Sequence, residues 1–555
     1  MKKMLLAGLI ISFVSGFSTW GRVEEGLMAD LVLFNGKVFT VDAAQPWAQA
    51  VAIRDGKFVA VGKDEEIRKL IGKETEVIDL DGKLALPGFN DAHLHFANGG
   101  LYLLGIDLRP ARDEKEFARI LKEYLYKTPK GEWVTGGNWD HENWPSKKHP
   151  RKEMIDPFTV DHPVLVSRLD GHMALANSLA LKLAGITRDT PDPQGGEIVK
   201  DKKTGEPTGI LRDNAMDLVN KVVPPLSREK RERAIRAAMR HAQEMGVTSV
   251  QDNSSREDLE IYQDLSRKGE LGVRINAWRG VDGWADFQRI GITAPFGDPF
   301  LRLGTVKLFV DGSMGAGTAL FFEPYADDPS TSGLPIHTQA ELEALVRDAD
   351  AAGLQIAAHA IGDMANAWIL EAFAMARAAG GGHGSRHRVE HAQVVRASDV
   401  ARFKELGVIA SIQPSHCIDD MRWAEKRIGA RVRDAYRFAS FLAGGVRLAF
   451  GTDWDVEPLD PRLGLYAAVS RELPAGGPAG GWHPEEKLKL AQAVEAYTLG
   501  SAYAEFQEQV KGSIQPGKLA DLVVMENDLF KIPQKDILST PVVLTVLNGK
   551  IVFKK

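Results

Sequence analysis

Two histidines separated by one residue, His93 and His95, stand at the end of an apolar run. Side chains alternate along a β-strand, so both imidazoles would point to the same face and could share one metal ion. His359, His391 and Asp453 each follow an apolar run of their own. Neutral imidazoles and a carboxylate are the ligands that a divalent ion such as zinc prefers. Together these residues predict a metal site.

Lys307 is unusual because it lies inside an apolar run, residues 305–310. Burial of an ammonium is costly and lowers its pKa, and a nearby divalent ion would lower it further. The neutral amine could then add CO₂ to give a carbamate, an oxygen donor able to bridge two metal ions. The residues alone support two other interpretations equally well: an ion pair with Asp311, or a side chain that reaches solvent.

Short apolar runs alternate with helical stretches along the chain, a pattern typical of parallel βα units. These units are the elements that must position the candidate residues. Eight runs resemble strands: 84–95, 247–252, 273–278, 306–311, 354–359, 388–391, 408–413 and 448–453. Helices are predicted between them, including 228–245, 339–352, 366–379 and 397–406. Eight units favour a closed (β/α)₈ TIM barrel of the α/β class, in which the carboxyl ends of the strands converge at the rim where active sites lie.

Both chain ends carry short β-rich runs with turn signals. Hairpins are predicted at Asn35-Gly36, Asp55-Gly56, Asp81-Gly82 and Asn548-Gly549. The simplest packing joins residues 29–86 and 505–555 in a composite β-sandwich beside a barrel of residues 87–504; the alternative is two unrelated edge hairpins. Residues 98–226 exceed an ordinary connection between barrel strands, so we expect an inserted cap subdomain over the barrel mouth, after the first strand.

Composition sets broad limits. The chain has 555 residues, a formal net charge of −6 and a single cysteine, Cys417. This charge gives no reason to expect a nucleic-acid partner, and one cysteine excludes a disulfide framework or a cysteine-rich zinc site. Residues 1–22 resemble a secretory signal peptide, with an apolar run too short for a stable membrane span. The protein would then be exported or periplasmic; if translation starts instead at Met28, it would be cytoplasmic.

The chain as a whole resembles the amidohydrolase superfamily, specifically the amidohydrolase-3 (YtcJ-like) group. The matching segments are residues 86–95 (LPGFNDAHLH), 170–177 (DGHMALAN), 306–313 (VKLFVDGS), 390–391 (EH), 451–453 (GTD) and 517–522 (GKLADL). The resemblance covers nearly all of the chain after Met28. It implies a barrel flanked by a composite β-sandwich, and hydrolysis of amide-type C–N bonds other than peptide bonds.

The same resemblance implies two divalent metal ions. His93 and His95 would bind the more buried ion, and His359 and His391 the outer one. Carboxylated Lys307 would bridge the two ions. Asp453 would contact the buried ion and serve as the general base.

A mechanism follows from that arrangement. Two metal ions lower the pKa of a shared water, and Asp453 accepts its proton as the oxygen attacks the carbonyl carbon. Protonated Asp453 then delivers this proton to the leaving nitrogen. His172 lies in a segment that resembles a motif of the group, and it would orient the substrate or stabilise the oxyanion. The alternative is a histidine at a helix start that bonds to nearby backbone.

Three residues are weaker substrate-binding candidates. Trp139 would form an aromatic wall of the pocket or belong to the core of the cap. Asp311 would touch the substrate or hold the end of its own strand. Gln413 and His416, after the seventh strand, could both face the substrate, and for His416 a surface position is the favoured alternative.

The leading hypothesis is a metal-dependent hydrolase that acts on a small-molecule, amide-type substrate with two divalent ions, zinc by ligand type. An ester, lactone or carbamate hydrolase at the same site is one alternative. A metal-binding protein without catalysis is another, although it gives no reason for Asp453 beside four histidines. The resemblance also allows a homodimer.

Overall fold

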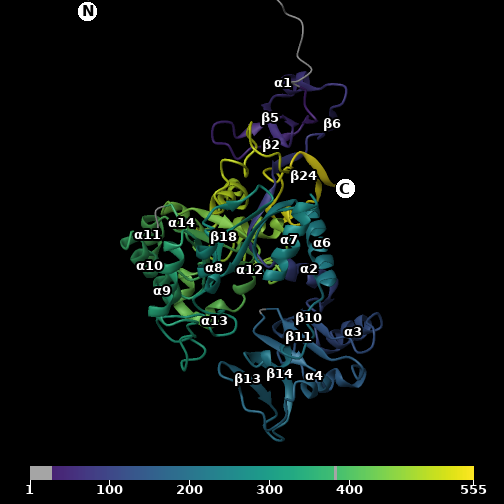
Figure 1. Cartoon of the computed structure of the whole chain (residues 1–555), viewed down its shortest axis with the longest axis vertical. Coiled ribbons are helices and arrows are strands. Elements are labelled where there is room, and N and C mark those ends of the chain that lie inside the picture. The colour runs from purple at the N-terminus through teal and green to yellow at the C-terminus, as the bar shows by residue number, and fades with distance from the viewer. Residues whose placement is uncertain (1–27, 170, 381–383) are drawn as a thin grey trace, which may run out of the picture.

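The computed structural model describes residues 28–169, 171–380 and 384–555, so the signal peptide expected at 1–22 and the first residue of the 170–177 motif lie outside the described residues. Figure 1 shows three parts along the long axis: a β-sandwich near both chain ends, a barrel in the middle and a cap at the opposite end. Within the described ranges, we find no helix that is both long and apolar enough to cross a membrane.

Eight parallel strands form the barrel. They are β8 (Phe89–Leu94), β15 (Val247–Asn253), β16 (Arg274–Gly280), β18 (Leu301–Phe309), β19 (Gln355–Ala360), β20 (Arg388–His391), β21 (Ile409–Ile412) and β22 (Leu448–Phe450). Neighbours in this order are hydrogen-bonded, and β22 lies against β8, so the ring is nearly closed. The predicted (β/α)₈ barrel is confirmed.

Helices cover the outside of the barrel. They are α2 (Phe96–Leu104), α6 (Arg228–Glu244), α7 (Arg256–Arg267), α8 (Trp284–Ile290), α9 (Gln339–Ala351), α10 (Asp363–Ala378), α11 (Ala397–Leu406), α14 (Phe438–Ala443) and α15 (Pro461–Ser470). The four helices that the sequence predicts are present, each with ends within three residues of the expected ones. Local sequence fixes such ends: α9 begins at a capping box formed by Thr338 and Glu341.

The sandwich has two sheets. One contains β5 (Lys57–Gly62), β4 (Ala50–Arg54), β1 (Leu31–Phe34) and β6 (Glu76–Asp79); the other contains β25 (Lys550–Lys554), β24 (Val542–Leu547), β23 (Leu522–Met525), β7 (Leu84–Pro87), β2 (Lys37–Phe39) and β3 (Trp47–Ala48). Strand β23 pairs antiparallel with β7, which joins the two chain ends in one sheet. An apolar cluster that includes Leu33, Val51, Val524 and Val546 contains residues of both sheets, so the predicted composite sandwich is confirmed.

Two of the four predicted hairpins are wrong. Asp55-Gly56 joins β4 to β5 and Asn548-Gly549 joins β24 to β25, as expected. Asn35-Gly36 and Asp81-Gly82 instead carry the chain from one sheet of the sandwich to the other. Asn35 and Asp81 have φ angles of 56° and 50°, so the turn conformation itself is the one expected. Burial of the sheet faces, rather than the turn, decides which strand pairs next.

The run 84–95, which the sequence predicts to be one strand, is divided between two sheets. Strand β7 belongs to the sandwich and β8 to the barrel, and Gly88 separates them. A Cβ on Gly88 would lie 2.3 Å from Oγ1 of Thr248. The close approach of these two segments therefore requires glycine where the chain passes from one sheet to the other.

The predicted insertion forms a cap with its own six-stranded sheet. Its strands in spatial order are β13 (Gly196–Lys200), β14 (Pro207–Asp213), β12 (Met173–Ala176), β11 (Val164–Arg168), β10 (Val134–Trp139) and β9 (Ile106–Asp107), with helices α3 (Glu114–Leu125), α4 (Ser178–Leu183) and α5 (Asp217–Asn220). The cap begins after α2 rather than at residue 98, because α2 packs against α6 on the barrel wall.

A buried ion pair fastens the barrel to the sandwich. Nε and Nη2 of Arg274, at the start of β16, donate to the two carboxylate oxygens of Asp521 at 2.7 and 2.8 Å, and the two side chains are 2% and 5% exposed. Arg274→Met would leave the carboxylate buried without this partner. We therefore expect the free energy of unfolding to fall by about 3–5 kcal/mol, measured by urea denaturation.

The matched control is Arg256→Met, which removes an exposed ion pair with Glu260. We expect this control to change the free energy of unfolding by less than about 1 kcal/mol. Equal urea midpoints for both variants would contradict the structural role of Arg274.

Candidate metal centre

The residues predicted to bind metal meet at the carboxyl end of the barrel. His93 lies near the end of β8, His95 precedes α2, and Asp453 follows β22. Oδ1 of Asp453 is 3.6 Å from Nε2 of His93 and 3.4 Å from Nε2 of His95. One donor atom from each of the three residues lies within 4.8 Å of the others, so the three could hold one ion.

A second group of donor atoms contains His391, His416 and Asp453, again within 4.8 Å of one another. His391 ends β20, and His416 lies on α12 (Pro414–Asp420), which follows β21. The prediction that His416 lies at the surface is wrong, since its side chain is 13% exposed and Nε2 lies 3.9 Å from Oδ2 of Asp453. The sequence did contain a signal for this position of His416. The residue follows a predicted barrel strand and is therefore expected at the same rim as the other ligands.

His359 lies beside this second group. Its ring centroid is 4.5 Å from that of His391, and its Nε2 lies 3.1 Å from the carbonyl oxygen of Gly312, to which it can donate. The structure therefore groups His391 with His416, whereas the sequence resemblance implied a pairing of His391 with His359.

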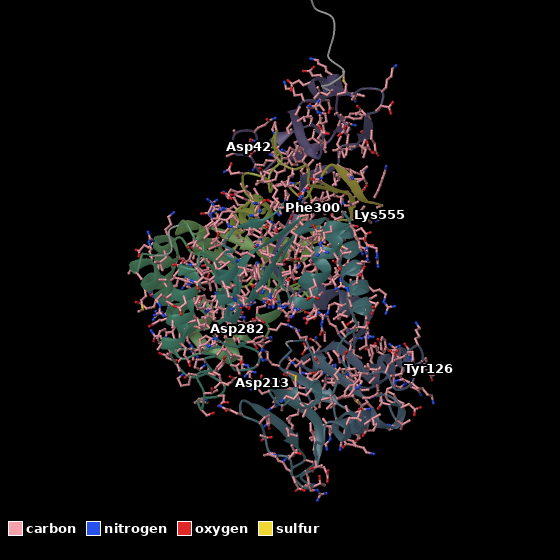
Figure 2. The ribbon with its side chains drawn as sticks, viewed as in Figure 1. Asp42, Tyr126, Asp213, Asp282, Phe300 and Lys555 are labelled. Atoms are coloured by element: carbon pink, nitrogen blue, oxygen red, sulfur yellow. The ribbon has the colours of Figure 1, made fainter. Side chains whose placement is uncertain are left out.

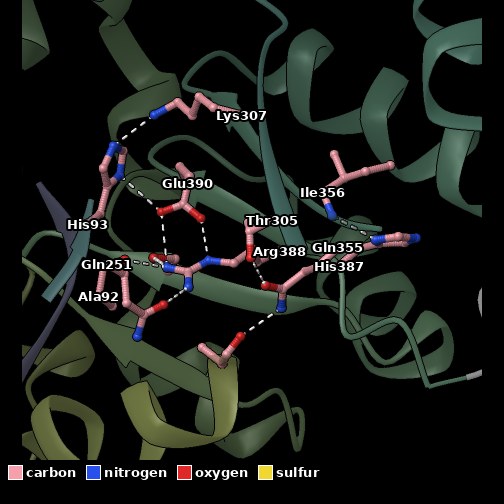
Figure 3. Close-up of polar contacts among 12 residues, drawn as sticks. Ala92, His93, Gln251, Thr305, Lys307, Gln355, Ile356, His387, Arg388 and Glu390 are labelled. Atoms are coloured by element: carbon pink, nitrogen blue, oxygen red, sulfur yellow. Dashed lines mark hydrogen bonds and ion pairs between the residues drawn. The ribbon is translucent and has the colours of Figure 1, made fainter. Parts of the chain in front are cut away.

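The side chain of Lys307 points toward the imidazole ring of His93 (Figure 3). The side chain is 2% exposed, and Nζ lies 2.7 Å from Nε2 of His93. This position fits neither an ion pair with Asp311 nor a side chain that reaches solvent. Lys307 is buried, and the carboxylate of Asp311 instead accepts hydrogen bonds from backbone N–H groups. The amine is instead within reach of the same atoms that could bind metal.

Glu390 contacts the other ring nitrogen of His93, Nδ1, as Figure 3 shows. Its Oε2 lies 3.0 Å from Nδ1 of His93, and Arg388 donates to both of its carboxylate oxygens. An Nδ1–H bond to this carboxylate leaves the lone pair of Nε2 directed toward the centre. The matching segment 390–391 included Glu390 but gave it no role, and nothing in the sequence pattern singled out Arg388.

Burial decides the charge state of the centre. It lowers the pKa of His93 to about 4 and that of His359 to about 3, so both imidazoles are neutral at pH 7 and available as ligands. Burial also lowers the pKa of Lys307 to about 8. Burial opposes ionisation of Glu390, but the charge of Arg388 and the contact with His93 outweigh it and hold the pKa of Glu390 at about 2.

The donor set fits divalent cations. Among the described residues, buried polar atoms without a hydrogen-bond partner include Nδ1 of His391, Nε2 of His416 and Oδ1 of Asp453. Buried polar atoms normally have partners, so a cluster of unpaired ones at this point is suited to a cation. The φ angles of His391 and Asp453 are 71° and 56°, a left-handed conformation that is rare outside glycine and clusters at functional sites.

A cavity of about 480 Å³ opens over these residues. Phe309, Met314, Ile361 and Trp423 give it an apolar side, and His172 belongs to the wall contributed by the cap. Nδ1 of His172 lies 2.9 Å from Oδ1 of Asp213, so this carboxylate can orient the ring. In Figure 2, Asp213 lies toward the barrel, whereas Tyr126 lies on the far side of the cap.

None of the three weaker substrate-binding candidates is among the residues that line the cavity, so the structure favours the second interpretation of Trp139 and Asp311 and places Gln413 behind the wall. Trp139 is fully buried in the cap, where Nε1 donates to the carbonyl of Val166 at 2.8 Å. Asp311 accepts backbone N–H bonds that tie the loop after β18 to the turn after β19. Gln413 is buried with its Nε2 3.4 Å from Nδ1 of His93. Each side chain serves packing or hydrogen bonding within the wall.

A barrel with histidines and an aspartate converging at its carboxyl rim defines the class of metal-dependent TIM-barrel hydrolases. A family model described as the amidohydrolase family matches residues 76–553. The chain therefore belongs to the amidohydrolase family, and the resemblance predicted from the motifs is confirmed.

Full-length relatives agree with this assignment. The chain is 36% identical to Protein LONG AFTER FAR-RED 3 of Arabidopsis thaliana, covering 95% of this chain and 92% of the relative. It is 33% identical to the putative amidohydrolase YtcJ of Bacillus subtilis (94% and 98%) and 26% identical to N-substituted formamide deformylase of Arthrobacter pascens (95% and 99%). An uncharacterized metal-dependent hydrolase from Pyrococcus horikoshii has a similar structure, with a TM-score of 0.76, 31% identity and coverage of 91% and 99%.

Proposed function

We propose that this protein hydrolyses amide-type C–N bonds of small molecules other than peptides, with N-substituted formamides as the first substrate class to test. The observation that carries the proposal is the pair of buried donor groups that share Asp453 at a cavity of about 480 Å³. That volume suits a small organic substrate. Similarity to a relative named N-substituted formamide deformylase supports the bond type.

His93, His95 and Asp453 would hold one divalent ion, and His391 would hold a second with His416 or His359. Divalent ions bound there, zinc by ligand type, supply Lewis acidity that polarises a carbonyl and lowers the pKa of water. The remaining chemistry belongs to the side chains of the chain itself.

Asp453 is proposed as the general base. Burial opposes its ionisation, but the surrounding histidines outweigh that effect and hold the pKa of Asp453 well below its usual range. The carboxylate is therefore ionised at neutral pH, and it faces the cavity. It would accept a proton from the attacking water and return it to the leaving nitrogen, so that the amine departs in neutral form.

Lys307 is proposed to carry CO₂. Its burial and lowered pKa raise the fraction of neutral amine, and this neutral form adds to CO₂ through a new N–C bond and loses one proton to solvent to give a carbamate anion. Its position 2.7 Å from Nε2 of His93 would place the carbamate oxygens among the donor atoms of the centre. A carbamate there would help His93 and the neighbouring donor residues to hold the divalent ions.

His172 is proposed to act on the substrate from the cap, where Asp213 orients its ring. Its second ring nitrogen would donate a hydrogen bond to the developing oxyanion. We expect His172→Ala to lower kcat about 10²-fold or more while the metal content stays unchanged. The control is His337→Ala, outside the residues that line the cavity, and equal kcat values for the two variants would contradict this role.

The proposal is tested with zinc-loaded protein and a matched set of N-benzylformamide, N-benzylacetamide and benzyl formate, with product release measured by chromatography. Turnover that favours the formamide over the ester supports amide hydrolysis. Preference for the ester indicates an ester hydrolase at the same site. Metal-loaded protein that cleaves no member of a broad amide and ester panel would overturn the assignment to a hydrolase.

A further inference from the structure

Glu457 is a carboxylate that the proposed chemistry leaves unexplained. It lies between Asp453 and α15, lines the same cavity as the metal centre and is 8% exposed. Within the described ranges, its carboxylate takes part in no hydrogen bond or ion pair. Buried carboxylates normally have a partner, so an unpaired one that faces a cavity indicates a ligand group.

Its acidic neighbours in the cavity wall differ because they are satisfied by the protein. Asp419 pairs with Arg422, and Asp420 accepts hydrogen bonds from Tyr436 and Gln393. Farther around the wall, Arg168 pairs with Asp140 and Arg427 with Asp327. Among the described residues of this part of the wall, outside the metal centre, the unpaired carboxylate is therefore that of Glu457.

The nearby guanidinium of Arg109 bonds to the backbone of this segment through Nη2, while its buried Nε has no hydrogen-bond partner among the described residues. Its Nη2 donates to the backbone carbonyls of Val456 at 2.5 Å and Asp455 at 3.3 Å. Nδ2 of Asn138 also donates to the carbonyl of Asp455 at 3.1 Å. Two cap residues therefore hold the segment that carries Glu457 in a fixed position, and its carboxylate remains open toward the cavity.

We propose that Glu457 is a specificity residue that binds a protonated basic nitrogen, such as a guanidinium, on the part of the substrate remote from the bond that is cleaved. This inference rests on the proposed function, since it places the cationic group in the same cavity. A cationic N–H donor would form a charge-assisted hydrogen bond with the carboxylate.

The charge state of Glu457 supplies a distinctive signature. Burial and the charge of Asp419 raise the pKa of Glu457 to about 8, against the opposing effects of Arg109 and Arg422. The group is therefore mostly protonated at pH 7, and a bound cation would lower its pKa and release a proton. The affinity for a cation should rise between pH 7 and pH 9, because Glu457 is then increasingly ionised before the cation binds.

The test compares n-butylguanidine with its neutral isostere n-butylurea by isothermal titration calorimetry on the zinc-loaded full-length protein. The guanidinium is a poor metal ligand, so binding would report on the cavity wall. We expect the guanidinium to bind at least about 30-fold more tightly than the urea, and this ratio to fall to about 3-fold or less in Glu457→Gln. Glu257→Gln, at an exposed position on α7, is the matched control and should keep the full ratio.

Calorimetric titration in two buffers, phosphate and Tris, measures the number of protons released on binding. This number separates a binding role of Glu457 from a structural one. At pH 7 the wild type should release close to one proton per guanidinium bound, and Glu457→Gln markedly less. Equal affinity for the two probes in the wild type, or a ratio that Glu457→Gln leaves intact, would overturn the proposal. Should the Gln variant fail to fold, the pH dependence of the wild-type ratio decides, and a ratio that does not rise between pH 7 and pH 9 would overturn the proposal.

Turnover distinguishes this inference from the proposed function. N-(4-guanidinobutyl)formamide should have a kcat/KM at least about 30-fold above that of N-(4-ureidobutyl)formamide. If both formamides are cleaved at equal rates, the role of Glu457 fails and the proposed function stands. If neither is cleaved but calorimetry shows the cation preference, the bond type is wrong and the cation site stands.

Discussion

Asp453→Asn is expected to lower kcat for an N-substituted formamide by about 10³-fold or more while the protein retains most of its metal. Asparagine keeps the size of the side chain and one neutral oxygen donor, but it cannot accept a proton from water at neutral pH. Proton transfer by a positioned base contributes about 10²–10⁴-fold, so its loss affects kcat directly. The measurement pairs steady-state kinetics with metal analysis by mass spectrometry on the same sample.

A matched control separates loss of the base from loss of a negative charge. Asp286→Asn alters an aspartate that is 71% exposed, and we expect it to leave kcat and metal content unchanged. Near-normal kcat in Asp453→Asn would end the assignment of the general base. A loss of activity that follows loss of metal in proportion would show that Asp453 is a ligand only.

Lys307→Ala is expected to lower kcat by about 100-fold or more and to reduce the metal content, because the variant lacks the group that would carry the bridging carbamate. Even partners that only orient metal ligands contribute about 10–100-fold. The shortened side chain leaves space beside His93, and propionate added to the assay can supply a carboxylate there. We therefore expect propionate to restore part of the activity and of the bound metal.

Lys307→Arg is the control for this rescue. Its guanidinium stays protonated at any working pH and cannot add CO₂, and it occupies the space that propionate needs. We expect no activity and no rescue in this variant. The carbamate would be excluded if Lys307→Ala kept normal activity, or if intact-mass measurement under native conditions found no added CO₂ on fully active wild type.

Much of the fold could be predicted because its signals are local. The alternation of short apolar runs with helical stretches predicted all eight barrel strands and the four helices named between them. His93, His95 and Lys307 could be identified as candidates because their residue types are out of place in buried strands. The errors arose where the same local pattern serves two structures, as at Gly88, where one apolar run enters two sheets.

The cavity wall was less predictable for a related reason. Trp139 and Gln413 lie in plausible places along the chain, but the direction of each side chain depends on partners distant in sequence: Nε1 of Trp139 bonds to Val166, and Gln413 lies against His93. His416 turns inward because α12 starts immediately after β21 and directs it toward Asp453.

The sequence by itself determined the α/β barrel, the joining of the chain ends and the kinds of donor atom at the rim, because periodicity, turn chemistry and residue type are properties of short segments. Only the tertiary structure decided which donors share a point, that His416 joins His391, and that Glu457 faces the cavity without a partner among the residues that the structure describes. The physical reason is that a metal or ligand site depends on distances of a few ångströms between residues hundreds of positions apart, and those distances are set by how the barrel closes and where the cap holds its loops.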